Sequence, residues 1–161
     1  MKKNLILAVV LALFASAASA DAQKPEFSWI GVGHGTGFTS VSTTPTISSA
    51  NTYLSVRGGH GWALDRDTLV GFELSFLGGP QKIVAIPSIV GMFALDDRNI
   101  FALVPHCGYS QITGNACGVD FNVGLMADYE SSMQILAGVT RFSKDLGGNK
   151  NLFQVGIQRF F

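Results

Sequence analysis

Apolar and polar residues alternate along the last stretch of the chain, residues 151–161. Phe153, Val155, Ile157 and Phe161 fall on one face of an extended strand, because successive side chains of a strand point to opposite sides. The opposite face carries glutamine, glycine, leucine and phenylalanine, and the sequence stops on two aromatic residues. A strand that closes a barrel in lipid has such an apolar outer face and an aromatic end. The pattern therefore predicts a transmembrane β-strand.

Residues 117–129 show the same alternation most clearly. Their odd-numbered positions are mainly apolar, whereas Asp120, Asn122 and Asp128 lie on the opposite face. A tilted strand needs about 9–11 residues to cross a bilayer, so this stretch is long enough. Similar stretches separated by turn residues predict strands over the rest of the chain. The predicted strands are 27–41, 50–63, 68–77, 82–95, 99–110, 117–129, 132–143 and 151–161.

The connections between these strands fall into two groups. Three are short and polar, as hairpin turns are, and we expect them at the barrel end that holds both termini: 65–67, 96–99 and 130–132. We expect the others, most of them longer, at the opposite end: 42–49, 78–81, 111–116 and 144–150. The prediction is an all-β, eight-stranded antiparallel transmembrane β-barrel of up-and-down topology. Strand 82–95 is apolar on both faces, so periodicity does not orient it, and Pro87 predicts a bulge.

Residues 1–20 have the three parts of a secretory signal peptide. A basic start precedes an apolar core at 5–14, which is too short to span a bilayer, and a small-residue cleavage site at 18–20. We expect 1–20 to be removed and 21–161 to form one domain. Removal would take two of the 11 basic residues and leave 9 against 11 acidic ones. With no basic cluster among them, this composition argues against nucleic acid as a partner.

Composition favours a membrane location for the exported domain. Charged residues make up 14% of the chain, below the roughly 25% of soluble domains. No apolar run is long enough for a transmembrane helix, and the longest, Ile83 to Leu95, contains Pro87. A closed barrel is the remaining way to span a bilayer. We therefore expect the outer membrane of a Gram-negative bacterium, with outer-membrane lipid and lipopolysaccharide as neighbours and the chain as a monomer.

The two cysteines, Cys107 and Cys117, test the register of one hairpin. If strands 99–110 and 117–129 meet in a hairpin centred on Ile112, the two cysteines face each other. Apolar residues then also face apolar residues along the outer surface, so the same register follows from both patterns. An even cysteine count in an oxidising compartment favours a disulfide. The alternative is a pair of reduced thiols near the rim.

Aromatic residues gather near the predicted strand ends on the side of the termini. An aromatic girdle at a membrane interface suits such rings, which have an apolar body and, in Trp and Tyr, a polar edge. The alternative is a buried aromatic core in a soluble sandwich. The candidate girdle residues are Phe27, Trp29, Trp62, Tyr129, Phe160 and Phe161.

Polar residues on the inward faces predict a network in the lumen. A narrow eight-stranded barrel is filled by side chains, so buried charges must pair, and Arg57 with Glu73 on the neighbouring strand is the expected ion pair. A hydrogen-bonded plug is favoured over a conducting, porin-like pore. The candidate residues are Arg57, Glu73, Asp120, Asn122, Asp128, Gln134, Gln154 and Gln158.

Candidate chemistry is sparse. His106, Ser110 and Asp120 all point inward and invite comparison with a hydrolytic triad. However, four strand residues place His106 and Ser110 about 13 Å apart, so the nucleophile and the base do not meet. The histidines at 34, 60 and 106 lie on three strands without metal-ligand spacing, so no metal site and no cofactor are expected.

The run from Gly31 to Gly37 has glycine at every second position. It does not match the dinucleotide-binding pattern G-x-G-x-x-G, and no helical pattern follows it. Glycine on one strand face instead relieves crowding inside a narrow barrel or permits a bend.

The opening FSWIGVGHGTGF, the hairpin-linked strands and the terminal VGIQRFF together resemble small outer-membrane proteins of the OmpA-transmembrane/OmpX type. The resemblance covers the mature chain as a pattern. It implies that the last strand carries the signal for the barrel-assembly machinery, on Phe153, Val155, Ile157 and Phe161. Arg159 departs from that pattern, in which an apolar or aromatic residue is usual.

The resemblance also implies a structural, adhesive or defensive role, although adhesive members rely on long extracellular loops that this chain lacks. A structural or surface-interaction protein without catalysis is therefore the favoured function. The alternatives are an outer-membrane acyl hydrolase or transferase that modifies lipid A and a soluble periplasmic β-barrel binding protein.

Overall fold

The computed structural model of the protein describes residues 26–38, 52–79, 82–96, 100–124 and 133–161. These residues form eight strands and no helix. The strands are β1 (Glu26–Phe38), β2 (Thr52–Ala63), β3 (Thr68–Gly78), β4 (Ile83–Ala94), β5 (Phe101–Ser110), β6 (Gly114–Gly124), β7 (Met133–Leu146) and β8 (Asn149–Phe160). No helix in this part of the chain has the length and apolar character needed to cross a bilayer.

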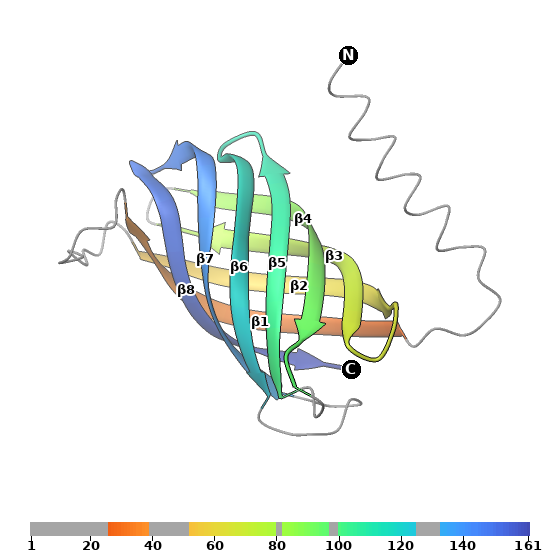
Figure 1. Cartoon of the computed structure of the whole chain (residues 1–161). Helices are drawn as coiled ribbons and strands as arrows, with labels where there is room; N and C mark the ends of the chain where they lie inside the picture. The colour runs from red at the N-terminus through yellow and green to blue at the C-terminus, as the bar shows by residue number, and fades with distance from the viewer. Residues whose placement is uncertain (1–25, 39–51, 80–81, 97–99, 125–132) are drawn as a thin grey trace, which may run out of the picture.

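The strands form one closed antiparallel barrel in which each strand pairs with its neighbours in sequence, and β8 returns to pair with β1. Val32 lies opposite Ile157 at the closure. At the C-terminal end of this β1–β8 pairing, Ser28 and Phe161 exchange two backbone hydrogen bonds of 2.9 Å. In Figure 1 the ribbons of β1 and β2 cross those of β5 and β6 steeply, as the opposite walls of a tilted barrel do. The predicted fold class, an eight-stranded up-and-down barrel, is confirmed.

The hairpin of β5 and β6 has the register that the cysteines predict. Cys107 lies opposite Cys117, and the two form a disulfide on the outer face of the barrel. Leu103 lies opposite Phe121 in the same register. The pairing of the cysteines is therefore confirmed, and it agrees with the apolar pattern of the two strands.

The connection between β7 and β8 is much shorter than predicted. Instead of a loop over 144–150, only Gly147 and Gly148 separate the strands, with φ angles of 61° and 85°. Two successive positive φ angles suit a tight hairpin turn and favour glycine. A register shift between Arg141 and Leu146 accommodates the polar residues that predicted a loop. The strand β6 likewise starts at Gly114, earlier than the predicted 117.

The pairing between the neighbouring strands β4 and β5 is incomplete. The bulge predicted at Pro87 is wrong, because β3 and β4 stay in one register through that residue. On its other side, the pairing of β4 with β5 starts at Ser88, directly after Pro87, and it has a gap between Val90 and Phe93, opposite Pro105. A proline has no N–H with which to complete a pair.

Candidate functional site in the barrel lumen

Side chains fill the lumen in three layers. The inward residues of three strands show the same order of layers. Inward residues run Leu77, Glu73 and Leu69 on β3, and β4 and β8 show the same apolar, polar, apolar order. We call the barrel end that holds the C-terminus the near end and the opposite end the far end. The far apolar cluster comprises Tyr53, Leu77, Val84, Ile86, Ala116, Phe142, Leu146 and Leu152. The near apolar cluster comprises Trp29, Leu69, Val90, Val104 and Phe160, with Phe27 and Met92 against it.

These clusters explain why β4 is apolar on both faces. Its inward residues Val84, Ile86 and Val90 belong to the two clusters, whereas its outward residues are exposed. Ser88, between them, faces the polar layer. Periodicity could not orient β4 because the lumen itself is apolar at both ends.

An ion pair spans the middle of the lumen. Arg57 Nη1 lies 2.6 Å from Asp120 Oδ2, and both side chains are at least nine-tenths buried. The two residues come from β2 and β6, which lie on opposite walls of the eight-stranded ring. Gln154 Nε2 donates to the other carboxylate oxygen of Asp120 at 3.1 Å. Asp120 therefore connects β2, β6 and β8 at the centre of the polar layer.

The predicted partner of Arg57, Glu73, is the more distant one. Arg57 Nη1 is 3.9 Å from Glu73 Oε1, so the predicted ion pair of these neighbours is present, but it is longer than the pair with Asp120. Glu73 also accepts hydrogen bonds from Trp29 Nε1 at 2.9 Å and from Ser75 Oγ at 2.8 Å. The long arginine side chain crosses the lumen, which a rule based on adjacent strands does not anticipate.

The remaining polar residues form a second, uncharged group. Gln134 Oε1 accepts hydrogen bonds from Asn122 Nδ2 at 2.9 Å and from Gln158 Nε2 at 3.1 Å. This group links β6, β7 and β8. Asp128, also predicted to face the lumen, lies outside the described residues.

Glycines provide the room for the polar layer. A Cβ atom at Gly31 would lie 2.9 Å from Gln158 Cβ, and one at Gly33 would lie 2.7 Å from Ser55 Oγ. A Cβ atom at Gly138 would overlap the carboxylate of Asp120. The glycines of β1 face inward, which agrees with the interpretation that they relieve crowding.

His106 and Asp120 approach each other, but Ser110 stands apart from them. His106 Nδ1 is 3.9 Å from Asp120 Oδ2, and His106 Nε2 lies 2.9 Å from Thr140 Oγ1. Ser110 Oγ accepts a hydrogen bond from the backbone N–H of Ile112 at 3.2 Å. Thr140 is therefore the hydroxyl beside the histidine, and the sequence reasoning missed it. The sequence could have indicated it, because Thr140 lies an even number of residues from the inward Gln134 on the same strand and therefore shares its face.

A small cavity lies between this polar layer and the far apolar cluster. Its volume is about 20 Å³, which is room for about one water molecule. Arg57, Glu73, Ser88, His106 and Thr140 are among the residues that line it. This volume is far below the roughly 300 Å³ or more of small-molecule sites.

The three histidines do not converge. His34 faces outward and is exposed. His60 Nδ1 lies 3.0 Å from Ser28 Oγ, close to the first residue of β1. Within the described residues, no group of three or more His, Cys, Asp or Glu side chains is arranged to hold a metal ion.

Two residues of the predicted girdle lie inside the barrel, and a third, Phe27, packs against the near apolar cluster while partly buried. Trp29 and Phe160 are 3% and 4% exposed, and their rings pack 5.7 Å apart in the near cluster. The girdle assignment of these two is therefore wrong. Trp29 has the parity of the inward glycines, and its Nε1–H finds the buried carboxylate of Glu73, so a lumen position satisfies both its ring and its donor.

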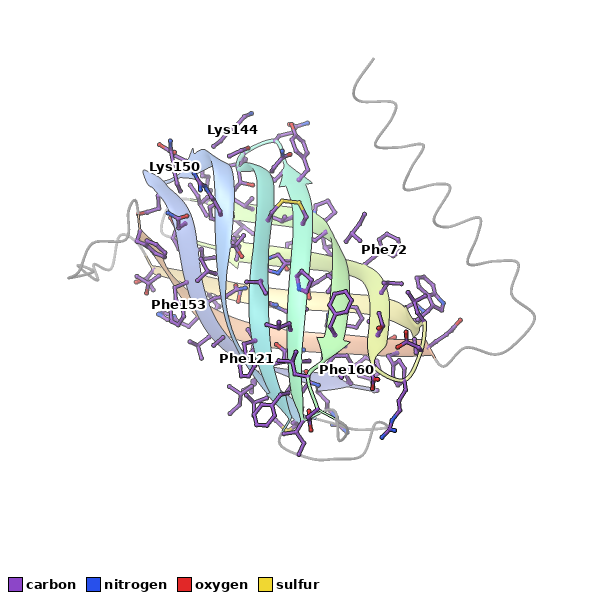
Figure 2. All side chains as sticks on the ribbon, in the orientation of Figure 1. Phe72, Phe121, Lys144, Lys150, Phe153 and Phe160 are labelled. Atoms are coloured by element: carbon purple, nitrogen blue, oxygen red, sulfur yellow. A yellow bond between two sulfur atoms is a disulfide. The ribbon has the colours of Figure 1, made fainter. Side chains whose placement is uncertain are left out.

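The other girdle candidates differ in position. Phe161 is 62% exposed, and Trp62 lies on the outward side of β2, where its Nε1 donates to Glu26 Oε1 at 3.1 Å. Tyr129 lies outside the described residues. Phe153, Val155 and Ile157, predicted to carry the assembly signal, all face outward from β8. Figure 2 shows Phe153 and Phe121 on the outer surface, and the disulfide toward the far end.

A scan of the chain against models of protein families finds no match, and a search among curated proteins finds no match either.

Proposed function

We propose that this protein is a small outer-membrane β-barrel with a structural or surface-interaction role and a sealed lumen. In this proposal residues 1–20 direct export and are removed, residues 21–161 insert as a monomer with the barrel-assembly machinery, and both termini face the periplasm. The outward residues of β8, from Phe153 to Ile157, present the assembly signal.

The observation that carries the proposal is the outer face of the barrel. All eight strands turn large apolar side chains outward, each 39–60% exposed, and we call this set the apolar belt. A soluble monomer rarely exposes a continuous apolar patch above a few hundred Å². The belt comprises Ile30, Val32, Leu54, Val56, Leu74, Phe76, Ile89, Phe93, Phe101, Leu103, Val119, Phe121, Ile135, Val139, Phe153, Val155 and Ile157.

The filling of the lumen supports a structural role over conduction. Apolar clusters occupy the far and near parts of the lumen, and Arg57 crosses the polar layer between them to Asp120. Among the described residues, side chains therefore fill the interior, as is typical of a narrow eight-stranded barrel. The polar layer thereby links strands on opposite sides of the barrel.

The alternative of an acyl hydrolase has weaker support. A serine mechanism needs hydrogen-bond contact between the hydroxyl and the base, and the contact of His106 is with Thr140 instead of Ser110. The cavity beside them has room for about one water. A soluble periplasmic binding protein would be expected to bury its belt residues, whereas these side chains are exposed on the outer face of the barrel.

Membrane fractionation tests the proposal directly. The protein is expressed with its first 20 residues in a Gram-negative host, and inner and outer membranes are separated on a density gradient. We expect the processed chain in the outer membrane, and a gel mobility that changes on boiling because the folded barrel resists detergent. Samples run with and without reductant report on the Cys107–Cys117 disulfide.

Recovery of the processed chain in the detergent-free periplasmic fraction would contradict the proposal. Mass spectrometry of lipid A from cells with and without the protein separates the enzymatic alternative, because a change in acyl chains requires a hydrolase or transferase. The expected result is an unchanged acyl pattern.

A further inference from the structure

The two ends of the barrel carry opposite charge. Among the described residues, the far end has Lys82, Arg141, Lys144 and Lys150 against Asp145. The near end has Glu26, Asp65, Asp67 and Asp96 against Arg66 and Arg159. The far end is thus net basic and the near end net acidic, although the chain as a whole is close to neutral.

The sequences between the described strands do not reverse this contrast. Residues 39–51 and 80–81 contain no charged residue, residues 97–99 contain one acidic and one basic residue, and residues 125–132 contain Asp128 and Glu130. Positive charge at the far end therefore comes from the strands and turns that the structure describes.

Three of the far-end cations gather on one hairpin. Arg141, Lys144 and Lys150 belong to β7 and β8 on either side of the Gly147–Gly148 turn, and all three are exposed. We call them the basic hairpin. Figure 2 shows Lys144 and Lys150 at this end of the barrel.

The contacts that the side chains of the basic hairpin make leave most of its positive charge free to interact with an anion. Lys144 Nζ donates to the backbone oxygen of Gln111 at 3.3 Å. Lys150 Nζ is 4.0 Å from Asp145 Oδ1, and both side chains are more than half exposed. An exposed ion pair of this kind contributes little energy, so one aspartate does not neutralise three cations.

The basic hairpin stands directly at the border of the apolar belt. Val139 and Phe153, a belt pair, lie opposite each other, and the next outward pair toward the far end is Arg141 with Asn151. Two strand residues span about 7 Å. A molecule with acyl chains against the belt would hold its headgroup beside Arg141.

We propose that the basic hairpin binds the phosphate groups of lipids whose acyl chains lie against the apolar belt. Arginine presents a planar fork that matches two phosphate oxygens, and the two lysines supply point charges that adapt to different headgroups. The inference rests on the proposed function, because the phosphate must sit in a leaflet that surrounds the far end. It adds a lipid class and an orientation: the far end faces the more strongly phosphorylated leaflet.

The test uses the full mature chain refolded in detergent micelles and transferred to phosphatidylcholine vesicles. The probes are lipid A with two phosphate groups, the same lipid A after enzymatic removal of both, and inorganic phosphate. Retained lipid A is counted by native mass spectrometry, and affinity is measured from lipid titrations. The variant is Arg141→Gln/Lys144→Gln/Lys150→Gln, and the control removes the two described cations of the near end, Arg66→Gln/Arg159→Gln.

The variant of the basic hairpin should bind phosphorylated lipid A about a hundredfold more weakly, at about fivefold for each cation near an anionic surface. The control should stay within about twofold of the wild type, since its cations lie at the near end, away from the proposed phosphate groups. Dephosphorylated lipid A should bind all three proteins equally weakly, and inorganic phosphate should not displace the lipid.

Equal losses in the variant and the control, or no loss in either, would overturn the inference, as would full displacement by inorganic phosphate. Failure of the wild-type chain to insert into vesicles would instead refute the proposed function. Insertion and heat-modifiable migration are measured on every protein, so the two failures are distinguishable.

Discussion

The polar layer and the far apolar cluster fill the same lumen, yet they hold the strands together in different ways. The polar layer depends on particular atoms that meet across the ring, as Arg57 and Asp120 do over 2.6 Å. The far cluster depends on volume, with Phe142, Leu146 and Leu152 packed among other apolar side chains. Removing the partner of a buried polar or charged group lowers the free energy of unfolding far more than removing a contact of an apolar group does. The polar layer should therefore tolerate few substitutions and the apolar cluster many.

The largest effect is expected at the centre of the polar layer. Asp120→Ala leaves Arg57 buried, with Glu73 at 3.9 Å as its remaining carboxylate neighbour. We expect the free energy of unfolding to fall by about 3–5 kcal/mol, the usual cost of an uncompensated buried charge. Urea titrations in vesicles, followed by tryptophan fluorescence, measure it. The double variant Arg57→Met/Asp120→Leu removes both charges and should be less destabilised than Asp120→Ala; the reverse order would contradict the role of the pair.

The next prediction concerns the space around Asp120. Gly138→Ala places a methyl group against the carboxylate of Asp120, so it should lower the free energy of unfolding by about 1–3 kcal/mol through overpacking. Gly58→Ala is the matched control, because its Cβ would meet only Trp29 O at 3.6 Å. That outward substitution should change stability by at most about 0.5 kcal/mol. Equal effects at the two glycines would remove the distinction between a filled lumen and an open outer face.

A smaller effect is expected in the far cluster. Leu152→Met keeps the volume of a buried apolar side chain and should cost less than about 1.5 kcal/mol, because isosteric apolar swaps are tolerated. The same urea titration measures it. A loss as large as that of Asp120→Ala would show that the cluster also requires particular atoms, and the contrast between the two regions would fail.

The smallest effect is expected outside both regions, in the turn between β2 and β3. Asp65 accepts a hydrogen bond from the backbone N–H of Asp67 at 2.9 Å, and this bond lowers the pKa of the exposed Asp65 carboxyl below its ordinary value. A lowered pKa in the folded state stabilises above the ordinary Asp pKa, and the benefit disappears as pH falls through the lowered value.

Asp65→Ala should therefore be slightly less stable than the wild type at neutral pH and equal to it in acid. Urea midpoints of the two proteins, compared across that pH range, measure the difference. A gap that widened on acidification would contradict the assigned hydrogen bond.

Several features of the lumen could have been read from strand parity alone. Trp29 shares parity with Gly31 and Gly33, and Thr140 shares it with Gln134, so both positions face inward by the same rule that oriented Asp120. The partner of each side chain could not be read in this way. Arg57 and Asp120 are 63 residues apart and on opposite walls, and their contact depends on the diameter and stagger of the closed ring.

By itself, the sequence determined the number of strands, the faces of those that alternate clearly and the register of the cysteine hairpin, because a period of two and paired apolar positions are local properties of a strand. Only the tertiary structure decided the layering of the lumen, the second and shorter ion pair of Arg57 with Asp120, and the gathering of Arg141, Lys144 and Lys150 at one border of the apolar belt. These features depend on which side chains meet when the ring closes. Distances across a closed ring are set by all eight strands together.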